Sequence, residues 1–255
     1  MPENPMTDPS DPAAWDERYA EAVWSGNPNM ALVHEVAAMT PGTALDVGCG
    51  EGADAIWLAE KGWQVTGLDV SAVGIDRGRA AAADAGVEIE WLVTGLLGLD
   101  ENRRFDLVSA FYPVLLRSDD RNAERALLRA VAPGGTLLFV HHVMDAPTAE
   151  PSEGGEEAGH GHGHGHEGGH GHGHSHGHGH GHEHEGEAGE EAATRPAFDH
   201  SLLVMPEGLH GLLSTPEYAD TWRVEVFEER PRSVAAGHAA NHHVDDRILR
   251  ARRLG

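Results

Sequence analysis

The stretch Leu45-Asp46-Val47-Gly48-Cys49-Gly50-Glu51-Gly52 decides the fold, because it sets three glycines between an apolar run and an amphipathic pattern. The apolar run, residues 43–47, predicts a strand, and residues 52–60 predict a helix that ends at Gly62. Glycines at such a junction permit a tight turn and let a ligand approach main-chain atoms. The stretch therefore predicts a strand–loop–helix unit whose loop contacts a ligand.

Strand and helix patterns alternate on both sides of this loop. The strand patterns share alternating or continuous apolar residues and cover residues 43–47, 63–69, 88–93, 105–110, 136–140, 222–229 and 246–252. Helix patterns cover residues 71–86 and 121–131, and Pro133-Gly134-Gly135 is expected to stop the second helix. The alternation predicts an α/β fold with a doubly wound, mostly parallel seven-stranded sheet. The last two strands have no helix between them and predict a C-terminal antiparallel hairpin.

Composition divides the 255 residues into a folded part and an insertion. Residues 1–149 and 195–255 have ordinary apolar periodicity and are expected to form one domain. Residues 150–194 hold twelve of the twenty histidines, and from Ser152 to Ala193 they lack Val, Ile, Leu, Met and aromatic residues. Such a segment buries too little apolar surface to offset the entropy of ordering, so a disordered insertion rich in His, Gly and Glu is expected.

The net charge of −24 excludes a surface that wraps nucleic acid or lies on an anionic membrane. Cys49 is the single cysteine, which excludes an intramolecular disulfide and fits a reducing compartment. The first ten residues do not resemble a secretory signal, and no apolar run approaches the roughly 18 residues of a membrane span. These features predict a soluble cytoplasmic protein that acts on a small molecule.

An acidic residue indicates which kind of ligand the loop holds. Asp69 lies nineteen residues after Gly50, at the end of the next predicted strand. This spacing suits a carboxylate that accepts hydrogen bonds from ribose hydroxyls. The residues Gly48-x-Gly50-x-x-Ala53 also satisfy a dinucleotide fingerprint, so an NAD-dependent oxidoreductase stays open as an alternative.

The charges around the loop separate these two ligands. Asp46, Glu51 and Asp54 would surround a pyrophosphate with negative charge and repel it. S-adenosylmethionine carries an ammonium and a sulfonium group and no phosphate. The carboxylates therefore favour S-adenosylmethionine as the cofactor.

The motifs LDVGCGEGADA (45–55) and VTGLDVS (65–71) resemble the first two motifs of the class I S-adenosylmethionine-dependent methyltransferases. FDLVSA and VAPGGTLLFVHH are similar to the fourth and fifth strand segments of that Rossmann-like fold. Trp15-Asp-Glu-Arg-Tyr19 and Trp24-Ser-Gly resemble the lead-in of the thiopurine and tellurite-type branch. The resemblance covers about residues 14–145, with weaker agreement over residues 222–253.

The resemblance implies which residues contact the cofactor. The loop glycines line its methionine and ribose parts, Asp46 lies near the ammonium, and Asp69 binds the ribose hydroxyls. Val70 lies against the adenine, and Thr94 stands where the family usually has an acid that meets the adenine amino group. The full implied set is Trp15, Tyr19, Asp46, Gly48, Gly50, Gly52, Asp69, Val70, Thr94 and Ala110.

Methyl transfer requires that donor and acceptor are held close and in line. The acceptor is expected beside Ser109–Pro113, after the fourth strand, and Trp24, Phe111 and Tyr112 are aromatic candidates for the sulfonium. A general base is needed only for an acceptor that arrives protonated, so a thiol or a metalloid needs none. The sequence therefore leaves the catalytic residues unassigned.

Two histidine pairs and a group of arginines lie near the ends of predicted strands. His141-His142 and His242-His243 are candidates for a base or for metal ligands, with ordinary polar strand ends as the alternative. Arg247, Arg250, Arg252 and Arg253 alternate with apolar residues and follow two aspartates, which favours a solvated strand face over a basic patch.

The histidine tract has the chemistry of a metal site. Imidazole binds nickel, zinc, cobalt and copper, and histidines alternating with glycine can wrap an ion without strain. A metal-buffering or metal-resistance protein is the corresponding alternative function, and a tolerated repeat expansion is the other interpretation. The candidate ligands are His160, His162, His164, His166, His170, His172, His174, His176, His178, His180, His182 and His184.

Overall fold

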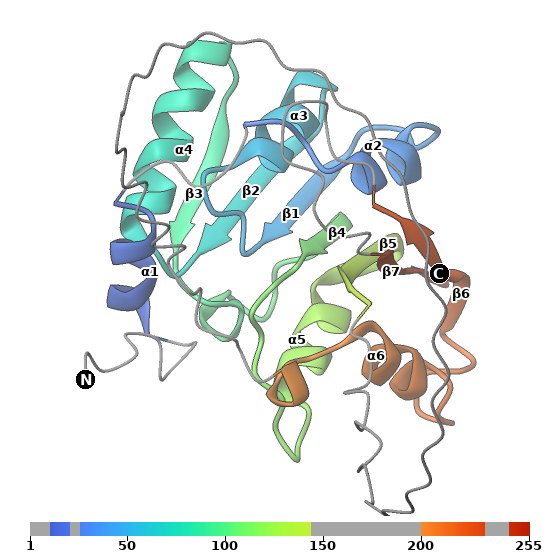
Figure 1. Ribbon diagram of the computed structural model, residues 1–255. Helices are drawn as coiled ribbons and strands as arrows, with labels where there is room; N and C mark the ends of the chain where they lie inside the picture. Colours follow the sequence, from blue (N-terminus) through green and yellow to red (C-terminus); the bar gives the residue numbers. More distant parts are fainter. Residues whose placement is uncertain (1–10, 21–25, 144–199, 233–244) are drawn as a thin grey trace, which may run out of the picture. The chain divides into compact units, whose positions relative to one another are not determined.

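The computed structural model describes residues 11–20, 26–143, 200–232 and 245–255. The described residues belong to one compact unit (Figure 1). The strands are β1 (Thr43–Val47), β2 (Gln64–Asp69), β3 (Ile89–Val93), β4 (Phe105–Phe111), β5 (Val131–His142), β6 (Trp222–Pro231) and β7 (Asp245–Arg253). The helices are α1 (Pro12–Arg18), α2 (Met30–Val36), α3 (Ala53–Glu60), α4 (Ala72–Ala85), α5 (Asn122–Ala130) and α6 (Pro206–Leu213), with short 3-10 turns at Leu96–Gly98 and His200–Leu202.

The seven strands form one sheet in the order β3-β2-β1-β4-β5-β7-β6. Strands β1 to β5 are parallel, and β7 runs antiparallel to both β5 and β6. The predicted doubly wound, mostly parallel sheet with a C-terminal antiparallel hairpin is therefore confirmed. The predicted domain division at residues 149 and 195 stays a prediction, because it falls outside the described residues.

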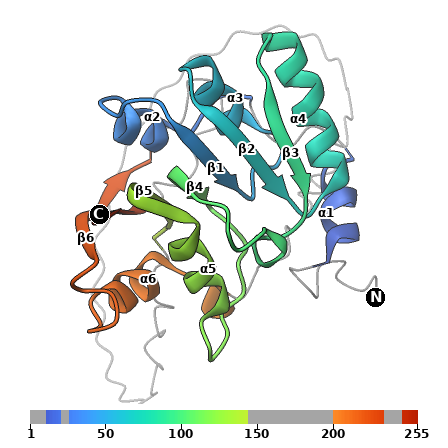
Figure 2. The same ribbon diagram turned by 180° about the vertical axis from the view of Figure 1, so that it is seen from behind.

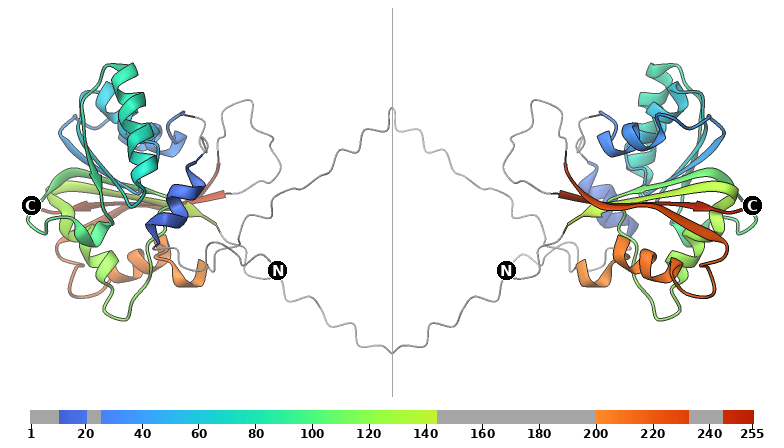
Figure 3. Two further views of the ribbon diagram at one scale, coloured as in Figure 1. Left: turned by 90° about the vertical axis from the view of Figure 1, so that its left-hand side faces the viewer. Right: turned by 90° about the vertical axis from the view of Figure 1, so that its right-hand side faces the viewer.

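Helices cover both faces of this sheet (Figures 2 and 3). One face packs against α2 and α3 through an apolar cluster that includes Leu32, Leu58 and Leu138. The other packs against α5 and α6 through Leu127 and Leu209, among others. Since parallel strands buried on both faces end at one edge, the carboxyl ends of β1, β2, β4 and β5 form a common rim. No helix in the described ranges is long and apolar enough to cross a membrane.

Local signals set most element ends where the sequence predicts them. Ser71 caps α4 by accepting a hydrogen bond from the Gly74 amide at 3.0 Å, and Gly86 ends the helix with a φ of 70°. The expected start of the fifth strand at residue 136 is wrong, because β5 begins at Val131 and includes Pro133–Gly135. The apolar run before the proline pairs with the start of β4, at Phe105, which the local turn signal does not reveal.

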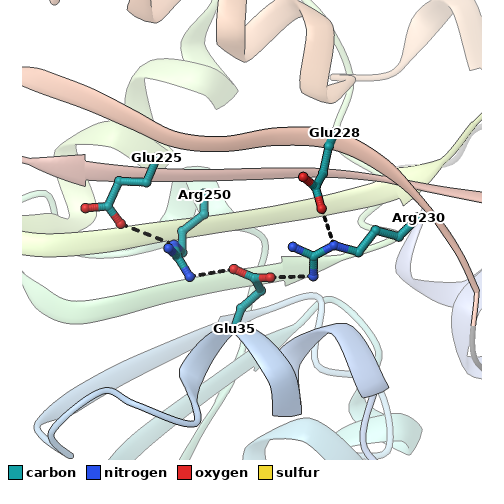
Figure 4. A network of polar contacts seen from close by, with 5 residues as sticks. All are labelled: Glu35, Glu225, Glu228, Arg230 and Arg250. Atoms are coloured by element: carbon teal, nitrogen blue, oxygen red, sulfur yellow. Dashed lines mark hydrogen bonds and ion pairs between the residues drawn. The ribbon is translucent and has the colours of Figure 1, made fainter.

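A charged network attaches α2 to the antiparallel end of the sheet (Figure 4). The Glu35 side chain is only 4% exposed, and its two oxygens accept from Arg230 at 2.5 Å and from Arg250 at 2.6 Å. The arginines also pair with Glu228 and Glu225. The buried Glu35 carboxylate thus has a cation at each oxygen, and each of these cations also pairs with a second carboxylate. The network holds in place the helix whose N-terminal residues approach the rim.

Candidate functional site

The glycine loop lies at the carboxyl end of β1 and has the backbone shape that only glycine adopts easily. Gly48, Gly50 and Gly52 have φ angles of 71°, 52° and 81°. The amides of Gly48 and Cys49 donate to the Leu68 carbonyl at 2.9 and 3.0 Å, which ties the loop to the end of β2. An added Cβ at Gly48 would meet only Pro113, at 3.9 Å. The backbone at Gly48 is thus uncrowded, and its nearest neighbour on that side is Pro113, which follows β4.

Asp69, at the end of β2, holds this loop from the side. One of its carboxylate oxygens accepts from the Gly50 amide at 2.9 Å, and the other accepts from the Ser71 amide at 2.9 Å. The side chain is buried, and this burial raises the pKa of Asp69, although the two amides oppose the rise. Each oxygen keeps a further lone pair, which is what a carboxylate needs to accept from ribose hydroxyls.

Asp46 carries a buried oxygen that lacks a partner. Its Oδ1 faces the Ser109 hydroxyl at 3.5 Å, but Oδ2 has no hydrogen-bond partner in the described part of the chain. Burial raises the pKa of Asp46 well above its usual range, and the nearby Asp54 and Asp69 raise it further. An orphaned carboxylate oxygen that is surrounded by other acids marks a place where a cation would be stabilised.

The acids that lie near Asp46 in the structure differ from those expected from the sequence. Glu51, counted from the sequence, is paired with Arg77 at 3.4 Å, so its charge is offset. Asp54 is capped by Asn29, whose amide and side-chain nitrogens donate to it at 2.7 Å each. The acids that raise the pKa of Asp46 are Asp54 and Asp69. The electrostatic argument from the sequence therefore loses Glu51 and keeps Asp46 and Asp54, and the preference that it gives stays a prediction.

Gly52 faces the protein interior and not open space. A Cβ at Gly52 would lie 2.4 Å from Cη2 of Trp91, and one at Gly78 would lie 2.8 Å from the same atom. The Trp91 indole thus fills the space left by glycines of the loop and of α4. Packing accounts for the absence of a side chain at Gly52, and its expected contact with the cofactor stays a prediction.

Helix α1 is fastened to the start of α4 by a carboxylate. Asp16 accepts from the Ser71 hydroxyl at 2.6 Å and from the Val73 amide at 3.1 Å, and the hydroxyl contact lowers its pKa. Tyr19 is buried, and its ring lies 3.3 Å from the Cβ position of Gly74. The ring of Trp15 lies 6.2 Å from that of Tyr19. The lead-in segment is therefore fixed beside Ser71, two residues after Asp69.

The residues expected around the adenine lie after β2 and β3. Val70 is partly exposed and lies 3.4 Å from the Cβ position of Gly95. The Thr94 hydroxyl donates to the Gly95 carbonyl at 3.3 Å, so its oxygen can still accept a hydrogen bond. Ala110 is completely buried in the core beneath α5, and the structure does not bring its side chain to the rim.

Several expected residues fall outside the described residues, namely Trp24, His242, His243 and the twelve tract histidines. Within the described ranges no group of three or more His, Cys, Asp or Glu side chains is arranged to hold a metal. The predicted metal site therefore stays a prediction.

The arginines of β7 do not form a basic patch. Arg247 pairs with Glu207 and Glu229, and Arg250 pairs with Glu35 and Glu225. Arg253 donates to the Val131 carbonyl at 2.6 Å. Each of these three arginines therefore binds a polar group of the protein itself.

A cluster at the ends of β4, β5 and β7 includes one residue that the sequence does not single out. Tyr112 donates through its hydroxyl to Asp246 at 2.8 Å, and its ring stacks on His142 with ring centroids 4.2 Å apart. His142 and Tyr112 are candidates from the sequence, whereas Asp246 is not. The register of β5 with β7, which sets His142 opposite Asp246, is the signal that reveals it.

Part of the chain is similar to known methyltransferases. Residues 44–135 match the family model of a methyltransferase domain. The ubiquinone biosynthesis O-methyltransferase of Alkalilimnicola ehrlichii is 34% identical over 97 residues, which are 37% of this chain and 39% of that protein. The match thus spans well under half the length of this relative.

Solved structures share the fold at low sequence identity. The N-methyltransferase NodS of Bradyrhizobium japonicum, solved with S-adenosyl-l-homocysteine, has a TM-score of 0.57 and 16% identity and covers 95% of this chain and 97% of its own. TehB of Haemophilus influenzae has a TM-score of 0.52 and 13% identity and covers 96% of this chain and 67% of its own. Residues 44–135 thus match a methyltransferase domain, and the chain shares the fold of solved methyltransferases.

Proposed function

We propose that the protein transfers a methyl group from S-adenosylmethionine to a small-molecule acceptor. The observation that carries the proposal is the buried Asp46, whose Oδ2 lacks a partner and whose neighbours Asp54 and Asp69 are also acids. A cationic nucleoside would relieve this charge, whereas a pyrophosphate would add to it. The matched family model and the relatives named as methyltransferases support the same function.

The residues of the rim fit this cofactor. Asp46 would face its ammonium group, Asp69 would accept from its ribose hydroxyls, and the open backbone at Gly48 would allow close approach. Val70 and Thr94 would lie along the adenine, and α1 with Trp15 and Tyr19 would border the pocket. When bound, the cofactor supplies an activated methyl group on a sulfonium. The chain's own task is to hold an acceptor in line with that group and to keep water away.

A small acceptor is supported by the charge of the chain and by its relatives. The net charge of −24 disfavours a nucleic acid, and the relatives include ubiquinone biosynthesis O-methyltransferases. A place in the thiopurine and tellurite-type branch rests on the lead-in motif and on the fold shared with TehB, so thiols and metalloid oxyanions belong in any acceptor screen.

Calorimetry with S-adenosylhomocysteine and NAD tests the proposal. We expect saturable binding of S-adenosylhomocysteine and none of NAD. Binding of NAD alone would overturn it in favour of a nicotinamide-dependent oxidoreductase. Uptake of metal alone, with neither nucleoside bound, would instead support the metal-buffering alternative that the histidine tract suggests.

A further inference from the structure

Three side chains from distant parts of the chain meet at the ends of β4, β5 and β7. The Tyr112 hydroxyl donates to Asp246 Oδ2 at 2.8 Å, and Asp246 Oδ1 lies 3.5 Å from His142 Nδ1. The rings of Tyr112 and His142 stack with an interplanar angle of 19°. The phenol, the carboxylate and the imidazole thus form one connected unit, in which Asp246 lies between the other two.

Burial determines which members of this unit donate a proton and which accept one. The Asp246 side chain is 5% exposed, and its Oδ1 has no hydrogen-bond partner within the described ranges other than the imidazole it faces. Burial and the nearby Asp246 raise the pKa of Tyr112, so the phenol keeps its proton and serves as a donor. The His142 side chain is 28% exposed and is the member of the unit that can meet a ligand.

The backbone is strained to hold Tyr112 in this position. Tyr112 has a φ of 51°, a left-handed conformation that costs a residue with a side chain about 1–2 kcal/mol. The Tyr112 amide donates to the Val140 carbonyl at 2.9 Å, and the Arg232 guanidinium lies 4.7 Å from the centre of its ring. Backbone strain that the surroundings enforce is often found where a side chain must point into a functional site.

This unit lies beside the glycine loop. Pro113, the residue after Tyr112, is the neighbour that faces Gly48, and Asp54 contributes electrostatically to the pKa of Tyr112. Strand β4 separates β5 from β1 by about 10 Å, and the register sets Asp46 level with Leu138, four residues before His142, so the backbones of Asp46 and His142 are about 16 Å apart. A cofactor that reaches from Asp46 toward the end of β5 and an acceptor beside it would together span that separation.

We propose that His142 is the general base that deprotonates a hydroxyl acceptor, and that Asp246 and Tyr112 are its positioning residues. The proposal rests on the proposed function and names the acceptor class. In the step, His142 Nε2 takes the hydroxyl proton while the acceptor oxygen bonds to the methyl carbon. The carbon–sulfur bond breaks, and its electron pair stays on sulfur. The products are a methyl ether, S-adenosylhomocysteine and an imidazolium that faces Asp246.

The unit suits a hydroxyl better than a thiol. A phenol has a pKa of about 10 and a thiol one of about 8.5, so near neutral pH the hydroxyl depends more on a base. The separation of 3.5 Å between His142 Nδ1 and Asp246 Oδ1 is longer than a hydrogen bond, as is common before a substrate closes the site. His141 meets the rings of both Tyr112 and His142 edge-on, but it is only 3% exposed, so it is less able than His142 to meet a ligand.

The kinetic test compares acceptors that differ in their need for a base. His142→Gln is assayed with phenol at neutral pH and with 4-nitrophenol at alkaline pH, where that acceptor is already ionised. Loss of a general base slows phenol methylation by about 10²–10⁴-fold and leaves 4-nitrophenolate methylation nearly unchanged. Tyr112→Phe and Asp246→Asn give smaller losses of the same selective kind. His34→Gln, at an exposed histidine of α2, is the matched control and keeps both rates.

The outcomes separate this proposal from the proposed function. Equal loss with both acceptors, no loss with phenol, or methylation of benzenethiol but of neither phenol would overturn the role of His142. If wild-type protein and His142→Gln bind S-adenosylhomocysteine alike by calorimetry, such a failure leaves the proposed function standing. Failure of wild-type protein to bind S-adenosylhomocysteine would overturn both.

A second readout needs no acceptor. Nitrogen NMR of the full-length protein reports which ring nitrogen of neutral His142 carries the proton. We expect it on Nδ1, which faces Asp246, and we expect the tautomer ratio to shift in Asp246→Asn. A proton on Nε2 in the wild-type protein would overturn the assignment, because that nitrogen could not then accept one.

Discussion

Replacing Gly52 with alanine separates a packing role from a ligand-binding role for the last glycine of the loop. The new Cβ would lie 2.4 Å from Cη2 and 3.0 Å from Cζ3 of Trp91, closer than real Cβ atoms approach a ring. Such overpacking costs about 1–3 kcal/mol. The φ of 81° adds about 1–2 kcal/mol for a residue with a side chain. We therefore expect Gly52→Ala to lower the free energy of unfolding by about 3 kcal/mol.

Thermal and urea denaturation measure this cost. A loss of this size lowers the melting temperature of a domain of this length by about 10 °C. Gly48→Ala is the matched control, because its φ of 71° carries similar backbone strain while its Cβ would meet only Pro113 at 3.9 Å. The double variant Gly52→Ala/Trp91→Leu should recover about 1–2 kcal/mol relative to additivity. A Gly52→Ala protein that melts like wild type but no longer binds S-adenosylhomocysteine would refute the packing account.

Three further predictions concern charge. Because burial raises the native pKa of Asp46, the native state binds the proton more tightly than the unfolded chain, and the free energy of unfolding falls as pH rises above about 4; Asp46→Asn should remove that part of the fall in urea titrations across pH. Glu35→Ala should cost about 2 kcal/mol, a moderate loss because Arg230 and Arg250 keep other carboxylates, and an unchanged urea midpoint would contradict the network's role. Calorimetry should find roughly three nickel ions bound to the full chain at about four histidines each, and equal uptake after deletion of residues 150–194 would assign the metal elsewhere.

Local patterns were sufficient for most of the parallel strands, although they placed the start of β5 five residues too late. The glycines after β1, the acid after β2 and the caps of α4 are signals that a short window contains, and they placed the loop and Asp69 correctly in the fold. Helices α1, α2 and α6 were not predicted, because each has only seven or eight residues; α1 and α2 also depend on contacts made far along the chain. Asp16 holds α1 to Ser71, and Glu35 holds α2 to Arg230 and Arg250.

The cluster of Tyr112, His142 and Asp246 could not be predicted for the same reason. Asp246 is 134 residues from Tyr112, and only the antiparallel insertion of β7 beside β5 sets it opposite His142. The charge of Glu51 looked unpaired in the sequence because its partner, Arg77, lies 26 residues later, on α4. The sequence therefore predicted the glycine loop but not the pairing of the charged residues around it.

The central claim is that a buried, unpartnered carboxylate selects a cationic nucleoside, and the most direct measurement is the effect of Asp46→Asn on two ligands. S-adenosylhomocysteine carries an ammonium group, whereas 5′-methylthioadenosine lacks it and keeps the same nucleoside. We predict that Asp46→Asn weakens binding of S-adenosylhomocysteine about 10- to 100-fold, the worth of one charged hydrogen bond, and leaves 5′-methylthioadenosine unaffected. Equal weakening of both ligands, or tight binding of NAD by the wild-type protein, would contradict the claim.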